Sequence, residues 1–103
     1  MTTSYLGHHV VVRTYSAGVH CGVLLKREGQ EVELSDARRI WSWEGANTLH
    51  EVALHGVGAG SCVSEAVSWI LLLQAVEVIR AHPDAVRSIE AAGWAPEEEA
   101  EGT

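Results

Sequence analysis

Apolar and polar positions alternate with a period of two along the first third of the chain, as is typical of half-buried β-strands. The first two runs are rich in β-branched residues, and Gly18 between them suits the tight turn of a hairpin. After a second turn, Val32 and Leu34 alternate with polar residues. The pattern therefore predicts an antiparallel meander with strands at 9–16, 19–27 and 31–35.

Two further strands are expected beyond this meander. The dipeptide Asp36-Ala37 can bend or bulge the chain before an extended pattern resumes over 38–43. The segment 67–79 is dense in Ile, Leu and Val, and its β-branched end over 75–79 favours a final strand rather than a helix. We expect that strand to be central in the sheet and the whole segment to form much of the core.

Helix signals occur at two places in the second half. Thr48 and Glu51 have the spacing of a capping box, which predicts a short helix over 48–56, although alternation in the same segment leaves a strand open. Pro83 suits the first turn of a helix and Asp84 its positive end. Apolar residues then recur at helical spacing, so a C-terminal helix is expected over 83–92.

These elements predict an α+β fold. It is a small antiparallel β-sheet or partly open barrel of about five strands, with one short internal helix and a C-terminal helix. A chain of 103 residues is long enough for one hydrophobic core and too short for two separate ones. We therefore expect a single globular domain over 1–96, followed by an acidic, disordered tail over 97–103.

The charge balance excludes some function classes. Fourteen acidic residues against seven basic ones give a formal net charge of -7, which argues against a bulk electrostatic grip on nucleic acid or an anionic membrane. No apolar run reaches the roughly 18 to 20 residues of a membrane span, and the first residues do not resemble a signal peptide. A cytoplasmic location is expected, with Cys21 and Cys62 as free thiols.

Tryptophan accounts for four of the six aromatic residues, and two of the four are one residue apart. In a strand, the period of two puts Arg39, Trp41 and Trp43 on one face. Arg38 and Ile40 then lie on the opposite face. An indole can stack on a purine and a guanidinium can bind phosphate oxygens through two hydrogen bonds, so this face suits a nucleotide or another flat anionic ligand.

The alternative is structural. Trp41 and Trp43 can pack in the core or at a subunit contact while Arg39 pairs with Asp36 or Glu44, and the sequence leaves both interpretations open. Trp69 and Trp94 are expected to be packing residues of the core and of the helix end. The candidate ligand-binding residues are His20, Arg38, Arg39, Trp41, Trp43 and Asn47.

Neither metal chemistry nor catalysis is supported by the residue spacing. Six histidines are present, but no CxxC or HExxH motif occurs, and His50 and His55 are five residues apart, which separates them around a helix. His20 and Cys21 are neighbours in a predicted strand, so their side chains point to opposite faces and cannot form a thiolate–imidazolium pair. We predict no metal, no cofactor and no enzymatic activity.

Three segments of the chain, 20–24, 36–43 and 45–53, resemble small proteins of tailed bacteriophages and prophages that have no established activity. The stretch from Ala37 to Trp41 is the most specific part, and the similarity extends over most of 9–92. The resemblance implies a phage origin and a place in the host bacterial cytoplasm. One recurring class of small phage proteins sequesters nucleotide immune signals inside compact oligomers.

In that context the arginine and tryptophan face suggests a protein that binds and sequesters a nucleotide-type small molecule. A domain this small has room for only a shallow pocket, so the ligand would be buried more easily between subunits, and a homo-oligomer is expected. The competing hypothesis is a structural or adaptor protein, either a virion accessory or an inhibitor of a host protein, whose tryptophan face contacts protein.

Overall fold

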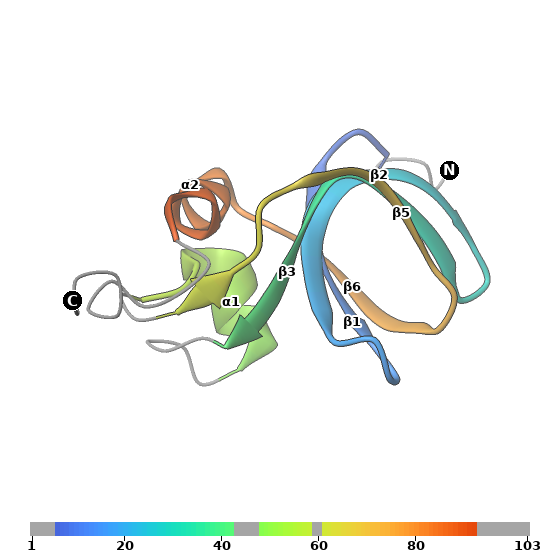
Figure 1. Cartoon of the computed structure of the whole chain (residues 1–103), viewed down its shortest axis with the longest axis horizontal. Helices are drawn as coiled ribbons and strands as arrows, with labels where there is room; N and C mark the ends of the chain where they lie inside the picture. The colour runs from blue at the N-terminus through green and yellow to red at the C-terminus, as the bar shows by residue number, and fades with distance from the viewer. Residues whose placement is uncertain (1–5, 43–47, 59–60, 93–103) are drawn as a thin grey trace.

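The computed structural model describes residues 6–42, 48–58 and 61–92. The described part of the chain forms six strands and two helices, one internal and one C-terminal, which confirms the predicted α+β class (Figure 1). In chain order the elements are β1 (His9–Thr14), β2 (Val19–Glu28), β3 (Glu31–Ser42), α1 (Leu49–His55), β4 (Cys62–Val63), β5 (Val67–Leu72), β6 (Ala75–Arg80) and α2 (Pro83–Ala91).

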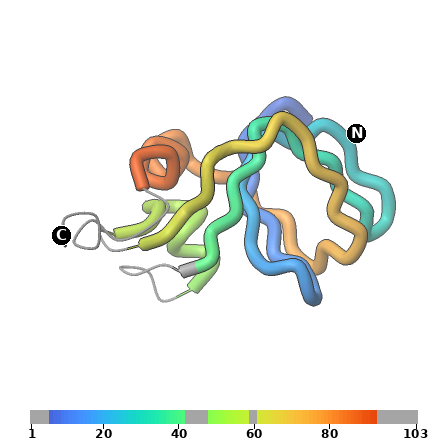
Figure 2. Tube along the Cα trace, in the orientation of Figure 1, coloured from blue at the N-terminus to red at the C-terminus, as the bar shows by residue number. Residues whose placement is uncertain are grey.

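The strands form one antiparallel sheet in the order β4-β3-β2-β1-β6, and β5 also pairs with β3. Strand β3 is long enough to have both β5 and β4 as neighbours on one side, β5 along its first half and β4 near its end. Consecutive strands β5 and β6 therefore lie at opposite ends of the strand order. The sheet curls so that its two ends, β5 and β6, meet at the short corner that joins them, as the chain trace shows (Figure 2). The two strands do not pair with each other, so the sheet does not close into a barrel.

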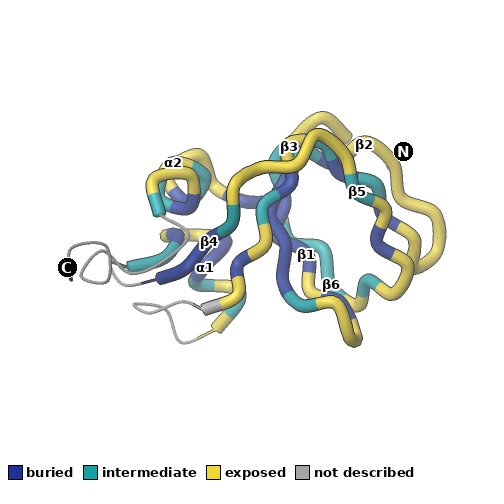
Figure 3. The backbone as a smooth tube through the Cα atoms, viewed as in Figure 1, coloured by how far each residue is buried: buried dark blue, intermediate teal, exposed yellow. Residues whose placement is uncertain are grey.

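The middle of the sheet is buried on both faces. In β1, Val10 and Val12 point to one face and Val11 to the other, and all three are fully buried. The barrel-side core lies inside the curl, and the helix-side core lies under α1 and α2 (Figure 3). The barrel-side core consists of Val10, Val12, Leu24, Val32, Leu34, Ala37 and Leu72. The helix-side core consists of Val11, Val19, Cys21, Ile40, Val52, Ala53, Val63, Ala81 and Ile89.

The two strands expected at 31–35 and 38–43 form one continuous strand, β3, with a bulge at the point between them. Asp36 has a φ of 50°, a conformation that short polar residues tolerate better than branched ones, and the register with β2 shifts at this point. Hydrogen bonding to β2 resumes after the bulge, with Arg38 opposite Cys21. The predicted bend was thus correct in place, but it bends one strand and does not separate two.

Both predicted helices are present, and their caps explain where they begin. The Thr48 hydroxyl accepts a hydrogen bond of 3.3 Å from the backbone N–H of Glu51, which settles the ambiguous 48–56 segment as a helix. Helix α2 begins with Pro83, and Nδ1 of His82 accepts a hydrogen bond of 3.1 Å from the Asp84 N–H. No helix in 6–42, 48–58 or 61–92 is long and apolar enough to cross a membrane.

Two expectations for 67–79 are wrong. The segment forms two strands, β5 and β6. The final strand was expected to be central in the sheet, but β6 ends the strand order. Trp69 has 53% of its surface exposed and is not a core residue. Trp94 and the predicted tail lie outside the described residues. Cys21 and Cys62 are both buried, and they are not joined to each other in a disulfide, as predicted.

Candidate functional site

A cleft of about 340 Å³ opens where the β1–β2 hairpin turn meets the corner between β5 and β6. Its volume falls in the lower part of the range of about 300 to 1,000 Å³ that is usual for small-molecule sites. One wall is polar and comes from the hairpin and β3, and the other is mostly apolar and comes from β5 and the corner. The residues that line it are Thr14, Ser16, Ala17, His20, Arg39, Ile70, Leu71, Leu72, Leu73 and Gln74.

Hydrogen bonds hold the rim of this cleft in shape. The Thr14 hydroxyl donates to the Gly18 carbonyl at 2.8 Å and accepts from the Ala17 N–H at 2.8 Å, which fixes the hairpin turn. The turn is joined to the β5–β6 corner by the Tyr15 N–H, which donates to the Gln74 carbonyl at 2.9 Å. The Ser16 hydroxyl lies 3.1 Å from Oε1 of Gln74. The opening is therefore largely formed before a ligand arrives.

Arg39 brings a positive charge to the cleft. Two hydrogen bonds to Ser64 fix the backbone of Arg39. The Ser64 hydroxyl accepts from the Arg39 N–H at 2.8 Å, and the Ser64 N–H donates to the Arg39 carbonyl at 2.9 Å. The guanidinium rests against Gly18, where an added Cβ would lie 3.0 Å from both Nε and Nη2. Among the described residues this guanidinium forms no ion pair, so it is available to an anion.

His20 lies directly opposite Arg39 across β2 and β3 and is only 4% exposed. Its Nε2 is 2.9 Å from the Ala17 carbonyl oxygen, which can only accept, so Nε2 carries the proton. The other ring nitrogen, Nδ1, forms no hydrogen bond among the described residues. Every described side-chain nitrogen that is sealed from solvent has a hydrogen-bond partner, so Nδ1 is not sealed from solvent. Nδ1 is therefore a solvent-reached acceptor, through the cleft that His20 lines.

The environment keeps this imidazole neutral near pH 7. Burial lowers the pKa of His20 below its usual 6.5, the hydrogen bond to Ala17 partly opposes this, and the charge of Arg39 lowers the pKa further. A neutral ring beside a cation presents one donor and one acceptor and adds no second charge. The cleft thus combines one fixed cation with a neutral, directional hydrogen-bonding group.

This depressed pKa predicts an acid-sensitive fold. The unfolded chain binds a proton at His20 more readily than the native state does, so native stability is retained above pH 6.5 and is lost as the pH falls below it. We expect His20→Gln to show a smaller loss of unfolding free energy than wild type between pH 7.5 and 5.5 in urea titrations. His55→Gln, at an exposed position, is the control. Equal pH dependence in all three proteins would contradict the prediction.

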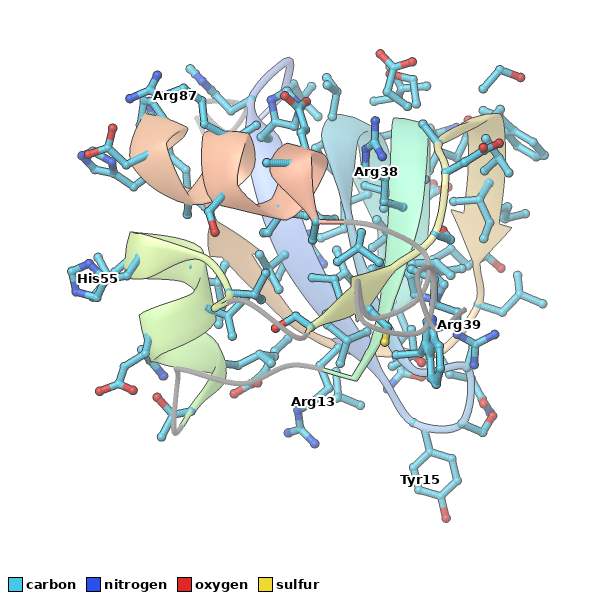
Figure 4. All side chains as sticks on the ribbon, turned by 60° about the vertical axis from the view of Figure 1, so that its left-hand side comes forward. Arg13, Tyr15, Arg38, Arg39, His55 and Arg87 are labelled. Carbon is cyan, nitrogen blue, oxygen red and sulfur yellow. The ribbon has the colours of Figure 1, made fainter. Side chains whose placement is uncertain are left out.

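The structure brings together only some of the residues that the sequence suggested. Arg39 and His20 share the cleft, and Trp41 is 52% exposed two residues further along β3 without lining it. Arg38 is not brought to them: Figure 4 shows it pointing away from Arg39, and its Nη1 donates to the Ser64 carbonyl at 3.3 Å. Trp43 and Asn47 lie outside the described residues.

The apolar wall was missed by the sequence reasoning. The residues from Ile70 to Gln74 reach the cleft only because β5 pairs with β3 and the corner contacts the hairpin turn, and both are long-range contacts. No local pattern marks such residues as part of a site. The one available signal was Gln74, a polar residue that interrupts a dense apolar segment.

The site contains little that could carry out a reaction. Of the described residues that line it, none is a carboxylate, and the Thr14 and Ser16 hydroxyls bond within the rim instead of to His20. Burial raises the pKa of Cys21 to about 12, and its side chain packs in the helix-side core on the opposite face from His20. Cys21 is therefore a protonated thiol and not a nucleophile. Within the described ranges, no three metal-ligating side chains group together.

A second cleft of about 300 Å³ lies at the start of α2, beside Arg80 and Arg87. Two of the side chains that line it have carboxylate neighbours, because Arg87 pairs with Asp84 and Nε2 of His9 lies 3.9 Å from Glu90, whereas Arg80 forms no ion pair among the described residues. An anion there would compete with these carboxylates. The cleft that contains Arg39 is for this reason the stronger candidate.

Comparison with known families places the whole cleft inside one domain. A family model described as a domain of unknown function, DUF6948, matches residues 7–89. The chain belongs to this family. All the residues that line the Arg39 cleft fall within the matched part of the DUF6948 domain. Searches of the curated proteins and of the solved structures gave no significant match. The description of DUF6948 states neither an activity nor a source, so the phage origin stays a prediction.

Proposed function

We propose that this protein binds a small nucleotide-type ligand in the Arg39 cleft and does not transform it. The observation that carries the proposal is the guanidinium of Arg39, which faces the cleft without an ion pair among the described residues. A guanidinium binds phosphate oxygens through two parallel hydrogen bonds. Since it is the one charged group among the described lining residues, it gives the site a net preference for anions.

The rest of the cleft suits the other parts of such a ligand. The side chains of Ile70 and Leu72 point toward the barrel side, and the leucine-rich wall offers an apolar surface to a flat base. Nδ1 of His20 can accept a hydrogen bond from an amino or hydroxyl group. Trp41, half exposed beside Arg39 along β3, is a stacking surface for a ligand part that extends out of the cleft.

The charge of the chain favours small ligands over polymers. A formal net charge of -7 repels a long polyanion, whereas a single phosphate group can be held by one local cation. A binder that leaves its ligand intact acts by lowering the free concentration of that ligand. Together with the resemblance to phage proteins, this supports sequestration of a nucleotide signal in the host cytoplasm.

The runner-up function is that of a structural or adaptor protein. It is favoured by the exposure of Trp41 outside the cleft, since exposed tryptophans are frequent anchors of protein contacts. The two functions differ in what they require of Arg39. Ligand binding needs the guanidinium in the cleft, whereas an adaptor surface built on Trp41 does not.

Thermal unfolding with a ligand panel tests the proposal. The panel contains nucleoside monophosphates, cyclic mononucleotides, cyclic dinucleotides and ADP-ribose derivatives, each at 1 mM. A ligand present at 100 times its Kd adds about 2.7 kcal/mol to the unfolding free energy, which raises the Tm of a domain of this size by roughly 10 °C or more. We expect at least one compound to stabilise the protein, and its affinity to fall about 10- to 100-fold in Arg39→Ala, which loses a charged double hydrogen bond.

Arg38→Ala is the matched control, because the same substitution one residue away removes a guanidinium from the opposite face. It should bind like wild type, and Trp41→Ala should weaken only ligands that extend beyond the cleft. The proposal is wrong if no compound stabilises the protein, or if Arg38→Ala and Arg39→Ala lose affinity equally.

A further inference from the structure

The outer face of β5 carries a row of exposed apolar side chains. This β5 row consists of Val67, Trp69 and Leu71, at every second position of the strand, and of Leu73, in the corner that directly follows it. Trp69 and Leu73 expose 53% and 59% of their surface. Of the residues between those of the row, Ile70 and Leu72 pack with the barrel-side core, and Ser68 is exposed. The strand is therefore apolar on both faces, although only its inner face has something to pack against within the described chain.

Neither helix covers this row. The helix-side core, under α1 and α2, draws its strand residues from β1, β2, β3 and β4 and none from β5, and Figure 1 shows β5 on the other side of the molecule from the helices. Within the described chain β5 pairs with β3 alone, so its other edge is unpaired. Its sequence from Val67 to Leu72 contains no charge and no proline, the features that usually protect an edge strand from association.

Trp69 is held in position without a partner protein. Its Nε1 donates a hydrogen bond of 3.1 Å to Oε1 of Glu33 on the neighbouring strand β3. An indole fixed in this way loses little conformational entropy when another surface packs against it. Exposed tryptophan is also the residue type most often found at the energetic centre of protein interfaces. The middle of the β5 row is thus preorganised for contact.

The size of the row matches the apolar part of a dimer interface. From their exposed fractions, the four side chains present about 400 Å² of surface. A standard interface buries about 800 Å² on each partner, of which roughly 500 Å² is apolar. The row alone supplies most of that apolar area, and the polar groups around it would form the rim.

We propose that the β5 row docks a second copy of this chain in a twofold-symmetric dimer. A row of alternating apolar residues matches its own antiparallel copy, and a twofold axis between Trp69 and Leu71 sets each Trp69 against the partner's Leu71 and each Leu73 against the partner's Val67. Leu71 and Leu73 also line the Arg39 cleft, so the second subunit would border the cleft. The dimer stands independently of the ligand proposal, but it would add a wall to that shallow site.

Sedimentation velocity on the full chain, from 1 to 100 µM and without nucleotide, tests the dimer. We expect the mass to rise from the monomer's 11.1 kDa to twice that value over this range. Added salt should strengthen association, because subunits of net charge -7 repel each other and the buried surface is apolar. Trp69→Thr and Leu73→Ser should each weaken the dimer at least 10-fold, with an unchanged circular dichroism spectrum.

Leu54→Ser is the matched control, since Leu54 is an equally exposed leucine on α1, away from the β5 row. It should dimerise like wild type. A chain that stays monomeric at 100 µM would overturn the proposal, and so would a dimer that persists unchanged in folded Trp69→Thr. Because no nucleotide is present, either result leaves the proposed ligand function unaffected.

Discussion

Gly56→Ala is expected to destabilise the protein by about 3 to 5 kcal/mol, the sum of backbone strain and steric overlap. Gly56 ends α1 with φ 84° and ψ -152°, a conformation that is essentially restricted to glycine. An added Cβ would also overlap the side chain of Ser88 on α2 and lie 3.1 Å from the Ala85 carbonyl oxygen. Ser88 cannot move away cheaply, because its hydroxyl bonds both the N–H and the carbonyl of Val57, at 2.9 and 2.8 Å.

Urea unfolding followed by circular dichroism measures this loss. Gly29→Ala is the matched control, since Gly29 also has a positive φ, 60°, but nothing lies within 4 Å of its added Cβ. That substitution should cost about 1 kcal/mol, from backbone conformation alone. If the two variants lose the same amount, α1 and α2 do not meet at Gly56 as described.

Leu24→Ala is expected to cost about 2 to 5 kcal/mol, whereas Leu25→Ala should cost less than about 1 kcal/mol. Leu24 is 1% exposed in the barrel-side core, so truncation leaves a cavity between the curled strands. Leu25 is the next residue of β2 and points outward, where its methyl groups already contact water. The pair therefore compares one chemical change on the two faces of the same strand.

The unfolding free energies of the two leucine variants, from the same urea titrations, make this comparison. Because a shift of one residue in register exchanges the faces of a strand, the result reports directly on the pairing of β2. Equal losses, or a larger loss in Leu25→Ala, would contradict this orientation of β2.

Local chemistry explains why much of the fold could be predicted. The turn at Gly18, the capping residue Thr48 and the proline that opens α2 each act within a few residues of the chain. The bend at Asp36 was visible for the same reason. The burial pattern also agrees with the predicted alternation along β3, since Ile40 is buried whereas Arg39 and Trp41 are exposed.

The role of β5 could not be predicted, because a period of two shows that a strand has two faces but not which of them is covered. In 67–73 both faces are apolar, so hydrophobicity alone placed Trp69 in the core. What decides its exposure is the pairing of β5 with the outer side of β3, away from both helices. That pairing joins residues more than thirty positions apart, such as Trp69 and Ser35.

The candidate site was predicted only in part for a related reason. Arg39 could be singled out as a candidate phosphate-binding residue from its type and neighbours. Its position opposite His20 depends on the register of β2 and β3 on either side of the Asp36 bulge. The wall from Ile70 to Gln74 depends in turn on how far the sheet curls, which is a property of all six strands together.

Mapping a bound ligand by two-dimensional ¹⁵N NMR tests the Arg39 cleft most directly. The labelled protein is titrated with each nucleotide that raises its Tm, or with the whole panel if none does. We predict saturable shifts that are largest at the hairpin turn from Thr14 to His20, at Arg39 and at the corner from Leu71 to Gln74. Shifts centred on Arg38 or on the start of α2, or no saturable shift with any nucleotide, would contradict the proposed function.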